Sequence, residues 1–486
     1  MLFNSLEFAL FLPLVFLIYW YLFHQKLRLQ NFFILIVSYV FYGWWDWKFL
    51  TLIFFSSLVD YSIGIALNKY EKPITRKLLL WLSVGFNLGL LGFFKYYNFF
   101  IDNFISAFTF FGNPISINSL NIILPVGISF YTFQTLSYSI DVFKRKISPT
   151  KDFIAFAAFV SFFPQLVAGP IERASNLLPQ FFKVREFSYQ NSVDGLRQIL
   201  WGIFKKIVIA DNCAEFVNII FNNPSNFTSL SLIAGAILFS FQIYCDFSGY
   251  SDIAIGVSKL LGFKLMQNFA FPYFSRDIAE FWRRWHISLS TWFRDYLYIP
   301  LGGSKGNNYV KIRNTFIIFI VSGFWHGANW TFIIWGLLNA LMFLPLLLGN
   351  RNRKNLEFTN VNRTTIKLKE MFSIVRNFMI VSFAWIFFRA ENLTSAINYV
   401  KLIFNTSLFQ LPKGFVFAST NLHPILLLLL LMFFILTEWA GKNNQYALEN
   451  LGMNWARPKR FALYYTIIFF IFAFQGSKQE FIYFQF

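Results

Sequence analysis

The feature that most constrains this chain is a series of apolar stretches, each close to the ~20 residues that a helix needs to cross a membrane. Stretches of this length exceed the roughly 10 residues of a membrane-spanning strand, so we expect helices. Ten stretches qualify: Leu6–Phe23, Gln30–Trp45, Trp47–Leu67, Leu78–Phe99, Leu120–Ile140, Ile199–Ile220, Ser229–Phe247, Met371–Phe388, Leu422–Trp439 and Phe461–Gly476.

The composition agrees with a membrane protein and excludes soluble classes. Hydrophobic residues make up 56% of the chain and charged residues only 13%, which is too little charge for a water-facing surface. The net charge of +19 does not indicate a nucleic-acid binder, because lysine and arginine gather in the cytoplasmic loops of membrane proteins. We therefore predict one integral-membrane domain over residues 1–486. Its class is all-α and polytopic, with about 10–12 transmembrane helices plus re-entrant and interfacial amphipathic helices.

The distribution of basic residues predicts the orientation. Basic clusters at 26–28, 69–77 and 144–151 follow the first, third and fifth predicted helices. The connections that follow the second and fourth predicted helices, residues 44–47 and 101–119, hold no lysine or arginine. Cytoplasmic loops are enriched in these residues, so the N-terminus is predicted to face out of the cytoplasm. No basic residue precedes the first apolar run, which favours a retained helix over a cleaved signal peptide.

Two stretches depart from the simple pattern. Phe153–Pro170 is apolar but has basic residues on both sides and contains two prolines, so we predict a re-entrant or interfacial segment. The stretch Lys259–Arg313 is basic, and Asp277–Tyr298 within it has helical periodicity with one aromatic face. Asp277 and Glu280 resemble a capping box at its start. This predicts one amphipathic helix that lies along the cytoplasmic interface or wedges between spans.

Of the four histidines, His326 has the most unusual setting. It lies between two glycines within the apolar region 314–349, and the twelve residues from Asn314 to Trp325 make about 18 Å of helix. That length reaches roughly the middle of a ~30 Å hydrocarbon core. An ionisable side chain at such depth is a functional candidate by default. The alternative is a neutral structural histidine that holds two helices together through a carbonyl.

The other polar candidates are weaker. His286 lies on the edge of the aromatic face of 277–298, where it could orient a reacting group or simply pack. Cys213 and Cys245 have no metal-ligand spacing, and we expect no metal. Phosphate-binding loops, nucleophile elbows, zinc-protease motifs and dinucleotide glycine patterns are absent. What remains is a buried base without a nucleophile of its own, which suits direct attack of a hydroxyl on an activated acyl group.

Several segments together resemble the membrane-bound O-acyltransferase family, in particular the bacterial alginate O-acetyltransferase membrane-subunit branch. The resemblance covers essentially the whole chain. It rests on residues 124–134, 163–171, 281–290, 294–303, 323–327 and the closing 480–486.

The resemblance implies a multi-helix fold with two funnels that meet at the family's invariant histidine, which falls on His326. The second polar position of the family falls on His286. It also implies an acyl thioester donor, acetyl-coenzyme A by expectation, that enters from the cytoplasm without any permanently bound cofactor. The acetyl group would reach a hydroxyl of an extracytoplasmic polysaccharide through an exported SGNH-type partner. The location implied is the bacterial inner membrane.

The basic stretch supplies candidates for binding the donor, because coenzyme A carries phosphate groups that a cytoplasmic cluster of cations attracts. The candidates are Arg283, Arg284, Arg294 and Lys305.

Two other functions stay open at this point. One is transfer of D-alanine to teichoic acids from a thioester on a small carrier protein. The other is a lipid or saccharide transporter without chemistry, in which His326 would relay protons. Transporters often contain two halves of similar topology, and this sequence shows no such repeat.

Overall fold

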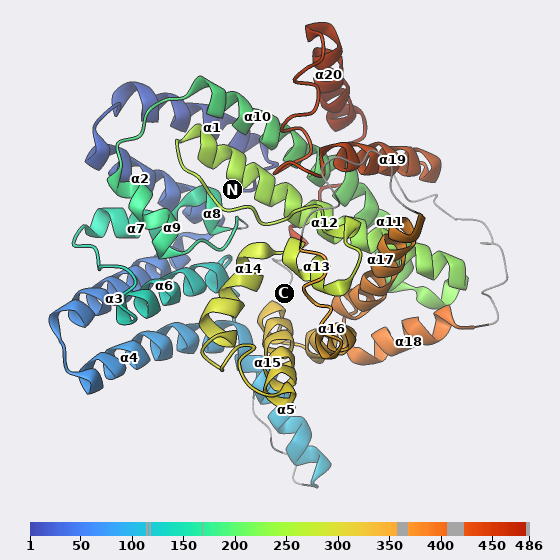
Figure 1. Ribbon diagram of the computed structural model, residues 1–486, viewed down its shortest axis with the longest axis horizontal. Coiled ribbons are helices and arrows are strands. Elements are labelled where there is room, and N and C mark those ends of the chain that lie inside the picture. Colours follow the sequence, from blue (N-terminus) through green and yellow to red (C-terminus); the bar gives the residue numbers. More distant parts are fainter. Residues whose placement is uncertain (113–114, 116–117, 168, 357–367, 406–421, 483–486) are drawn as a thin grey trace. The chain divides into compact units, whose positions relative to one another are not determined.

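The computed structural model describes residues 1–486 except 113–114, 116–117, 168, 357–367, 406–421 and 483–486 (Figure 1). Within the described ranges the regular structure is helical, which confirms the predicted all-α class. The chain divides into two compact units, residues 1–192 with 257–266 and residues 193–256 with 267–486. Each unit is described by itself, and a single domain over the whole chain stays a prediction.

The first unit is built mainly on the N-terminal apolar helices. They are α1 (Leu6–Leu17), α2 (Leu27–Asp46), α3 (Leu50–Lys69), α4 (Pro73–Leu91), α5 (Tyr97–Phe110), α6 (Ile128–Phe143), α7 (Phe153–Ser161), α8 (Phe163–Leu166) and α9 (Ala174–Leu177). A buried carboxylate connects three of them: Asp60 of α3 accepts hydrogen bonds from Ser83 and Asn87 of α4 and from Ser139 of α6, at 2.5, 2.7 and 2.6 Å. A buried polar group is tolerated when it is hydrogen-bonded in this way.

Two sequence predictions in this unit can be compared with the structure. The helix predicted to begin at Leu120 begins only at Ile128, because Gly127 adopts a left-handed conformation (φ 75°) directly before it. The predicted start is therefore wrong. Phe153–Pro170 forms the nine-residue α7 and the short α8, separated by Phe162, and residues 155–161 are all buried. Nine residues make about 13.5 Å of helix, too little to cross a membrane, as the prediction of a non-crossing segment requires.

The second unit holds the remaining helices. They are most of α10 (Tyr189–Ile203), α11 (Asp211–Asn222), α12 (Ser229–Leu260), α13 (Ile278–Arg284), α14 (Ile287–Phe293), α15 (Asn308–His326), α16 (Trp330–Leu348), α17 (Leu368–Arg389), α18 (Leu393–Ile403), α19 (Pro424–Gly441) and α20 (Arg457–Ala473). Between α10 and α11 the backbone continues as a π-helical stretch, Phe204–Ala210.

Helix α12 continues to Leu260, so the predicted end of this span at Phe247 is wrong. Two aspartates of α12 near this position, Asp246 and Asp252, are buried against two lysines of the π-helical stretch. Lys205 Nζ lies 2.5 Å from Asp252, and Lys206 Nζ lies 2.7 Å from Asp246. Because each carboxylate has a cationic partner, the helix can continue through these positions without leaving a buried charge uncompensated.

Helices α15, α16 and α17 form an antiparallel set. Phe332 and Trp335, near the start of α16, lie 4.9 and 5.4 Å from Phe388 and Trp385 near the end of α17, measured between ring centroids. The start of α17 therefore lies toward the end of α16.

Six helical segments in the described part of the chain are long and apolar enough to cross a membrane. They are residues 27–69, 73–110, 229–260, 330–348, 368–389 and 424–441. This agrees with the polytopic class, while the predicted count of about 10–12 spans stays a prediction.

Candidate active site

The segment that carries His286 is broken at that residue. The single helix predicted over Asp277–Tyr298 is wrong: α13 ends at Arg284, α14 begins at Ile287, and a π-helical turn follows from Arg294. The predicted start is confirmed, since Asp277 Oδ1 accepts a 2.8 Å hydrogen bond from the Glu280 amide.

The break has a tertiary cause. The amide of Ala270 donates to the carbonyl of Arg284, and the amide of Ile287 donates to the carbonyl of Asn268, both at 2.9 Å. These bonds take backbone groups that a continuous helix would pair within itself. His286 lies between them in the left-handed region (φ 42°), which is costly for a residue with a side chain and is typical of functional sites.

Asn268 also fixes the imidazole of His286. The Oδ1 of Asn268 accepts a 2.8 Å hydrogen bond from the Ser288 hydroxyl and lies 3.1 Å from His286 Nδ1, while its Nδ2 donates to Ser251 Oγ at 3.1 Å. A carbonyl oxygen only accepts hydrogen bonds, so Nδ1 of the neutral ring carries the hydrogen. The lone pair of His286 therefore resides on Nε2.

The protonation state of His286 follows from its burial. The residue is 1% exposed and lies between α13 and α14, outside the candidate spans. Burial lowers the pKa of His286 from 6.5 to about 3, because the cation would lose its hydration. The ring is neutral throughout the physiological range.

His326 is the last residue of α15 and lies within the same aromatic core. Its ring centroid is 6.5 Å from that of His286. The rings of Trp325, Trp335 and Phe388 surround it at 5.0, 5.2 and 5.3 Å. His326 is 3% exposed. The structure thus brings together the two histidines that sequence analysis selected, from separate helical segments.

Close packing of α15 on α16 sets the position of His326. A Cβ at Gly323 would lie 2.2 Å from the carbonyl oxygen of Phe332, and a Cβ at Gly336 would lie 2.3 Å from that of Phe319. Only glycine permits the two backbones to approach this closely. The glycine that precedes His326 by three residues is therefore a packing requirement of the site.

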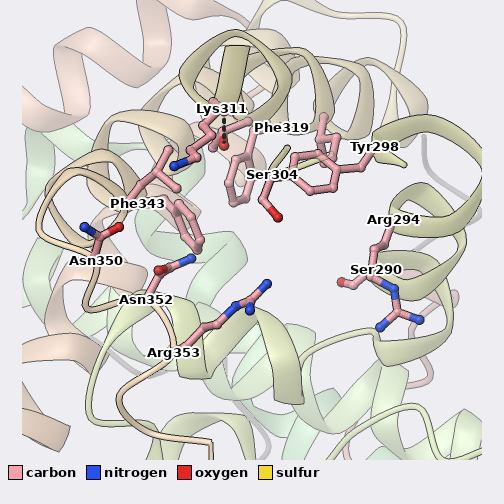
Figure 2. Close-up of a pocket in the computed structure, with 13 residues that line it drawn as sticks. Ser290, Arg294, Tyr298, Ser304, Lys311, Phe319, Phe343, Asn350, Asn352 and Arg353 are labelled. Carbon is pink, nitrogen blue, oxygen red and sulfur yellow. Dashed lines mark hydrogen bonds between the residues drawn. The ribbon is translucent and has the colours of Figure 1, made fainter. Parts of the chain in front are cut away.

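A cavity of about 510 Å³ opens beside α14, α15 and α16 (Figure 2). Basic and neutral polar side chains line much of it: Arg294, Lys311, Arg353, Ser290, Ser304, Asn350 and Asn352. Ser290 and Arg294 lie across the cavity from Phe343 and Asn350 (Figure 2). We call this the basic cavity.

Residues that line the basic cavity are linked to both histidines by a hydrogen bond in one case and by ring contacts in the other. Its lining residue Ser290 donates its backbone amide to the carbonyl of His286 at 3.0 Å. From the lining residue Phe319, ring contacts of 5.4, 5.6 and 5.2 Å lead through Trp282 and Trp335 to His326. A molecule in this cavity would therefore contact Ser290, which is bonded to the backbone of His286, and Phe319, which is separated from His326 by the rings of Trp282 and Trp335.

The four basic residues predicted to bind donor phosphates are placed differently. Arg294 lines the basic cavity and forms a 2.7 Å ion pair with Asp295. Arg283 donates to the backbone carbonyls of Asn352 and Asn355, and Arg284 pairs with buried Glu280 at 2.5 Å. Lys305 is exposed and does not belong to the lining.

Sequence reasoning missed Lys311, Arg353 and Asn268. Lys311 lies in the first turn of α15 and belongs to the basic stretch Lys259–Arg313, from which other residues were selected, and Arg353 belongs to the basic run that follows α16. No sequence pattern marked Asn268, because it is a single amide in an irregular segment. It contacts His286 only in the folded chain.

Comparison with known proteins shows which protein family this sequence matches. The sequence model of the membrane-bound O-acyltransferase family matches residues 32–388. The chain is 39% identical over 508 aligned residues to a probable alginate O-acetylase of Pseudomonas putida, with 100% of each chain covered. It is 32% identical over 534 residues to the peptidoglycan O-acetyltransferase of Helicobacter pylori, covering 100% of this chain and 98% of that one. A teichoic acid D-alanyltransferase of Streptococcus thermophilus is 31% identical over 238 residues, 44% of this chain and 55% of that one.

Proposed function

Because the chain belongs to the membrane-bound O-acyltransferase family, and is thus a multi-pass membrane O-acyltransferase, we propose that it transfers an acetyl group from acetyl-coenzyme A to an extracytoplasmic polysaccharide hydroxyl. The observation that carries the proposal is the pair of buried imidazoles, 6.5 Å apart, beside the basic cavity. In the bacterial inner membrane this cavity would face the cytoplasm, where basic residues gather.

The basic cavity is suited to the donor. Arg294, Lys311 and Arg353 present three cationic side chains in one space of about 510 Å³, a volume typical of small-molecule sites. Arginine and lysine bind phosphate oxygens through charge-assisted hydrogen bonds. The phosphates of coenzyme A would occupy this end, and the acetyl thioester would extend toward the rings around His326.

His326 is proposed as the general base. A hydroxyl attacks a thioester effectively only if its proton is removed as the new bond forms. In this step the imidazole of His326 takes the proton, the hydroxyl oxygen bonds to the carbonyl carbon, and the carbon–sulfur bond breaks. The thiolate then receives the proton, so the products are an acetyl ester and coenzyme A as its thiol. His286, neutral and fixed by Asn268, is assigned an orienting role.

Acetyl transfer is favoured over D-alanyl transfer by the extent of the similarity. The two relatives named as O-acetylating enzymes match over the whole of this chain, whereas the D-alanyltransferase matches over 44% of it. An exported SGNH-type partner that passes the group to the polysaccharide is part of the proposal. A carrier protein charged with D-alanine is the alternative donor, and offering both donors to the purified protein distinguishes them.

The decisive experiment replaces His326 with alanine in the purified, membrane-inserted protein. Acetyl transfer from acetyl-coenzyme A should fall by about 10²–10⁴-fold, the usual contribution of a general base. The matched control is His24→Ala, because His24 is an exposed histidine outside the site. Normal accumulation of His326→Ala with a near-native rate would refute the catalytic assignment. Failure of the wild-type protein to consume either acetyl-coenzyme A or carrier-bound D-alanine would instead favour a transporter.

A further inference from the structure

A second polar cavity, of about 360 Å³, lies in the same unit at the ends of α11 and α17 and along α18. Side-chain amides, hydroxyls and one pair of opposite charges dominate its lining: Asn222, Asn223, Ser225, Asn226, Arg389, Glu391, Ser395 and Asn398. Phe221 and Tyr399 complete it with a stacked pair of rings, 4.3 Å between centroids. We call it the asparagine pocket.

We propose that the asparagine pocket binds a saccharide segment of the acceptor polymer and so holds the polymer close to the exported partner that passes the acetyl group to it. Each asparagine amide offers two donors and one acceptor, the combination that neighbouring sugar hydroxyls require. The volume lies within the range of small-ligand sites. A protein-docking surface would instead be expected to have an apolar and aromatic centre. The inference rests on the proposed function for the identity of the acceptor.

The charged side chains of the pocket do not favour an anionic ligand such as a nucleotide. Arg389 donates to Asn218 Oδ1 at 2.8 Å and lies over the ring of Phe221 at 5.6 Å, so its guanidinium already has partners. Glu391 adds a negative charge beside it. With one arginine and one glutamate the lining carries no net charge, in contrast to the basic cavity.

The walls of the pocket are fixed before any ligand binds. Tyr399 of α18 donates its hydroxyl to the carbonyl of Leu232 of α12 at 2.8 Å, and Ser229 donates to the carbonyl of Leu402 at 3.1 Å. Beneath the pocket a buried apolar cluster joins the same helices: Ile220, Leu232, Ala236, Ile386, Tyr399 and Ile403. A preformed site loses less conformational entropy on binding.

The position of the pocket relative to His326 supports an acceptor role. Phe388, whose ring lies 5.3 Å from that of His326, immediately precedes the lining residue Arg389. Asn329, three residues after His326, donates its side chain to the carbonyl of Glu391 at 2.7 Å. The α17 end of the pocket is therefore attached directly to the segment that holds the proposed base.

The two cavities lie toward opposite ends of α16. Leu347 near its C-terminus lines the basic cavity, whereas Asn329 directly before its N-terminus holds the asparagine pocket. The 19 residues of α16 span about 28 Å, close to the thickness of a hydrocarbon core. If the basic cavity faces the cytoplasm, the asparagine pocket opens on the other side, where the extracytoplasmic polymer is accessible.

Direct binding measurements on the purified full-length protein test the inference. The probe is an oligomer of N-acetylglucosamine, which is uncharged, and its binding in the millimolar range supports the inference. An oligomer of mannuronate, which carries a carboxylate on each sugar, should bind more weakly, because the lining has no net positive charge. Asn223→Ala combined with Asn398→Ala removes two amides from different walls and should weaken binding on the order of tenfold or more. The matched control Asn454→Ala removes an exposed amide outside both cavities and should bind normally.

The outcomes separate this inference from the proposed function. If the wild-type protein transfers acetyl groups from acetyl-coenzyme A but does not bind the N-acetylglucosamine oligomer, or if the double variant binds it as the wild type does, the saccharide site is refuted and the acetyltransferase stands. If the double variant loses only transfer that depends on an exported partner protein, the pocket is a protein-docking site and the inference is wrong. Absence of acetyl transfer together with intact saccharide binding would overturn the proposed function alone.

Discussion

The contact between Asn268 and His286 supports a prediction that can be worked out from the structure. The Oδ1 of Asn268 lies 3.1 Å from His286 Nδ1, and Asn268 itself is fully buried. With a pKa of about 3, His286 is cationic in roughly one molecule in 10⁴ at pH 7. The proposed site therefore operates with this ring neutral, and a change that stabilises the cation should inhibit transfer.

Asn268→Asp makes that change with little alteration of shape. A carboxylate within hydrogen-bonding distance raises the pKa of a histidine by about 1–3 units, which would move His286 to roughly 4–6. We expect the rate of acetyl transfer to decline as the pH falls through this range, whereas the wild type should show no such decline from His286. Asn268→Ala should differ: it leaves the buried donors of His286 and Ser288 without their acceptor, at a cost of about 1–3 kcal/mol each.

The assay is the initial rate of acetyl transfer between about pH 4 and pH 9, a range that covers the expected decline, with the Michaelis constant for acetyl-coenzyme A measured in parallel. A positioning role predicts a change in turnover and in the pH profile, with little change in the donor constant. Asn454→Asp, which places the same charge on the exposed surface, is the control. If Asn268→Asp keeps both the wild-type rate and the wild-type profile, the protonation state of His286 is not coupled to transfer and its orienting role is refuted.

Two further predictions concern stability. Gly323→Ala would place a Cβ 2.2 Å from the Phe332 carbonyl oxygen, so it should destabilise the protein by roughly 1–3 kcal/mol and lower the melting temperature. Gly85→Ala, a helical glycine with open space around it, should be neutral or stabilising, and equal effects of the two substitutions would contradict the packing argument. Burial raises the pKa of Glu172 to about 7, so its contribution to stability is full below about pH 4.5 and is lost as the pH rises to about 7. Glu172→Gln should flatten the decline of the melting temperature over that window, and an unchanged slope would exclude Glu172 as its source.

Much of the fold follows from local sequence. Apolar stretches of membrane length predicted most of the long helices, because a lipid environment permits few alternatives to a helix for an unbroken apolar segment. The wrong predictions concern positions where a residue distant in the sequence decides whether a helix ends or continues. The span predicted to end at Phe247 continues as α12, because buried lysines from another helical segment compensate Asp246 and Asp252.

The break at His286 could not be predicted for the same kind of reason. The aromatic periodicity of 277–298 continues across the break, and Trp285–His286–Ile287 contains neither glycine nor proline. The helix ends because residues 268–270 offer backbone hydrogen bonds that compete with its own. The sequence therefore indicated that His286 lies near the aromatic core but not that its ring would face His326.

The basic residues show why composition alone does not locate a ligand site. Arg284 is bound to Glu280 in the protein interior, and Arg283 satisfies two backbone carbonyls, so both are committed to the fold. Arg294, whose ion pair with Asp295 is exposed, and Lys311 line an open cavity, where a ligand phosphate can reach them. All four belong to one basic stretch of sequence, and only their partners distinguish them. A cation that already has a buried partner cannot bind a donor without leaving that partner's charge or carbonyl uncompensated, which makes the cavity-lining residues the better candidates for phosphate binding.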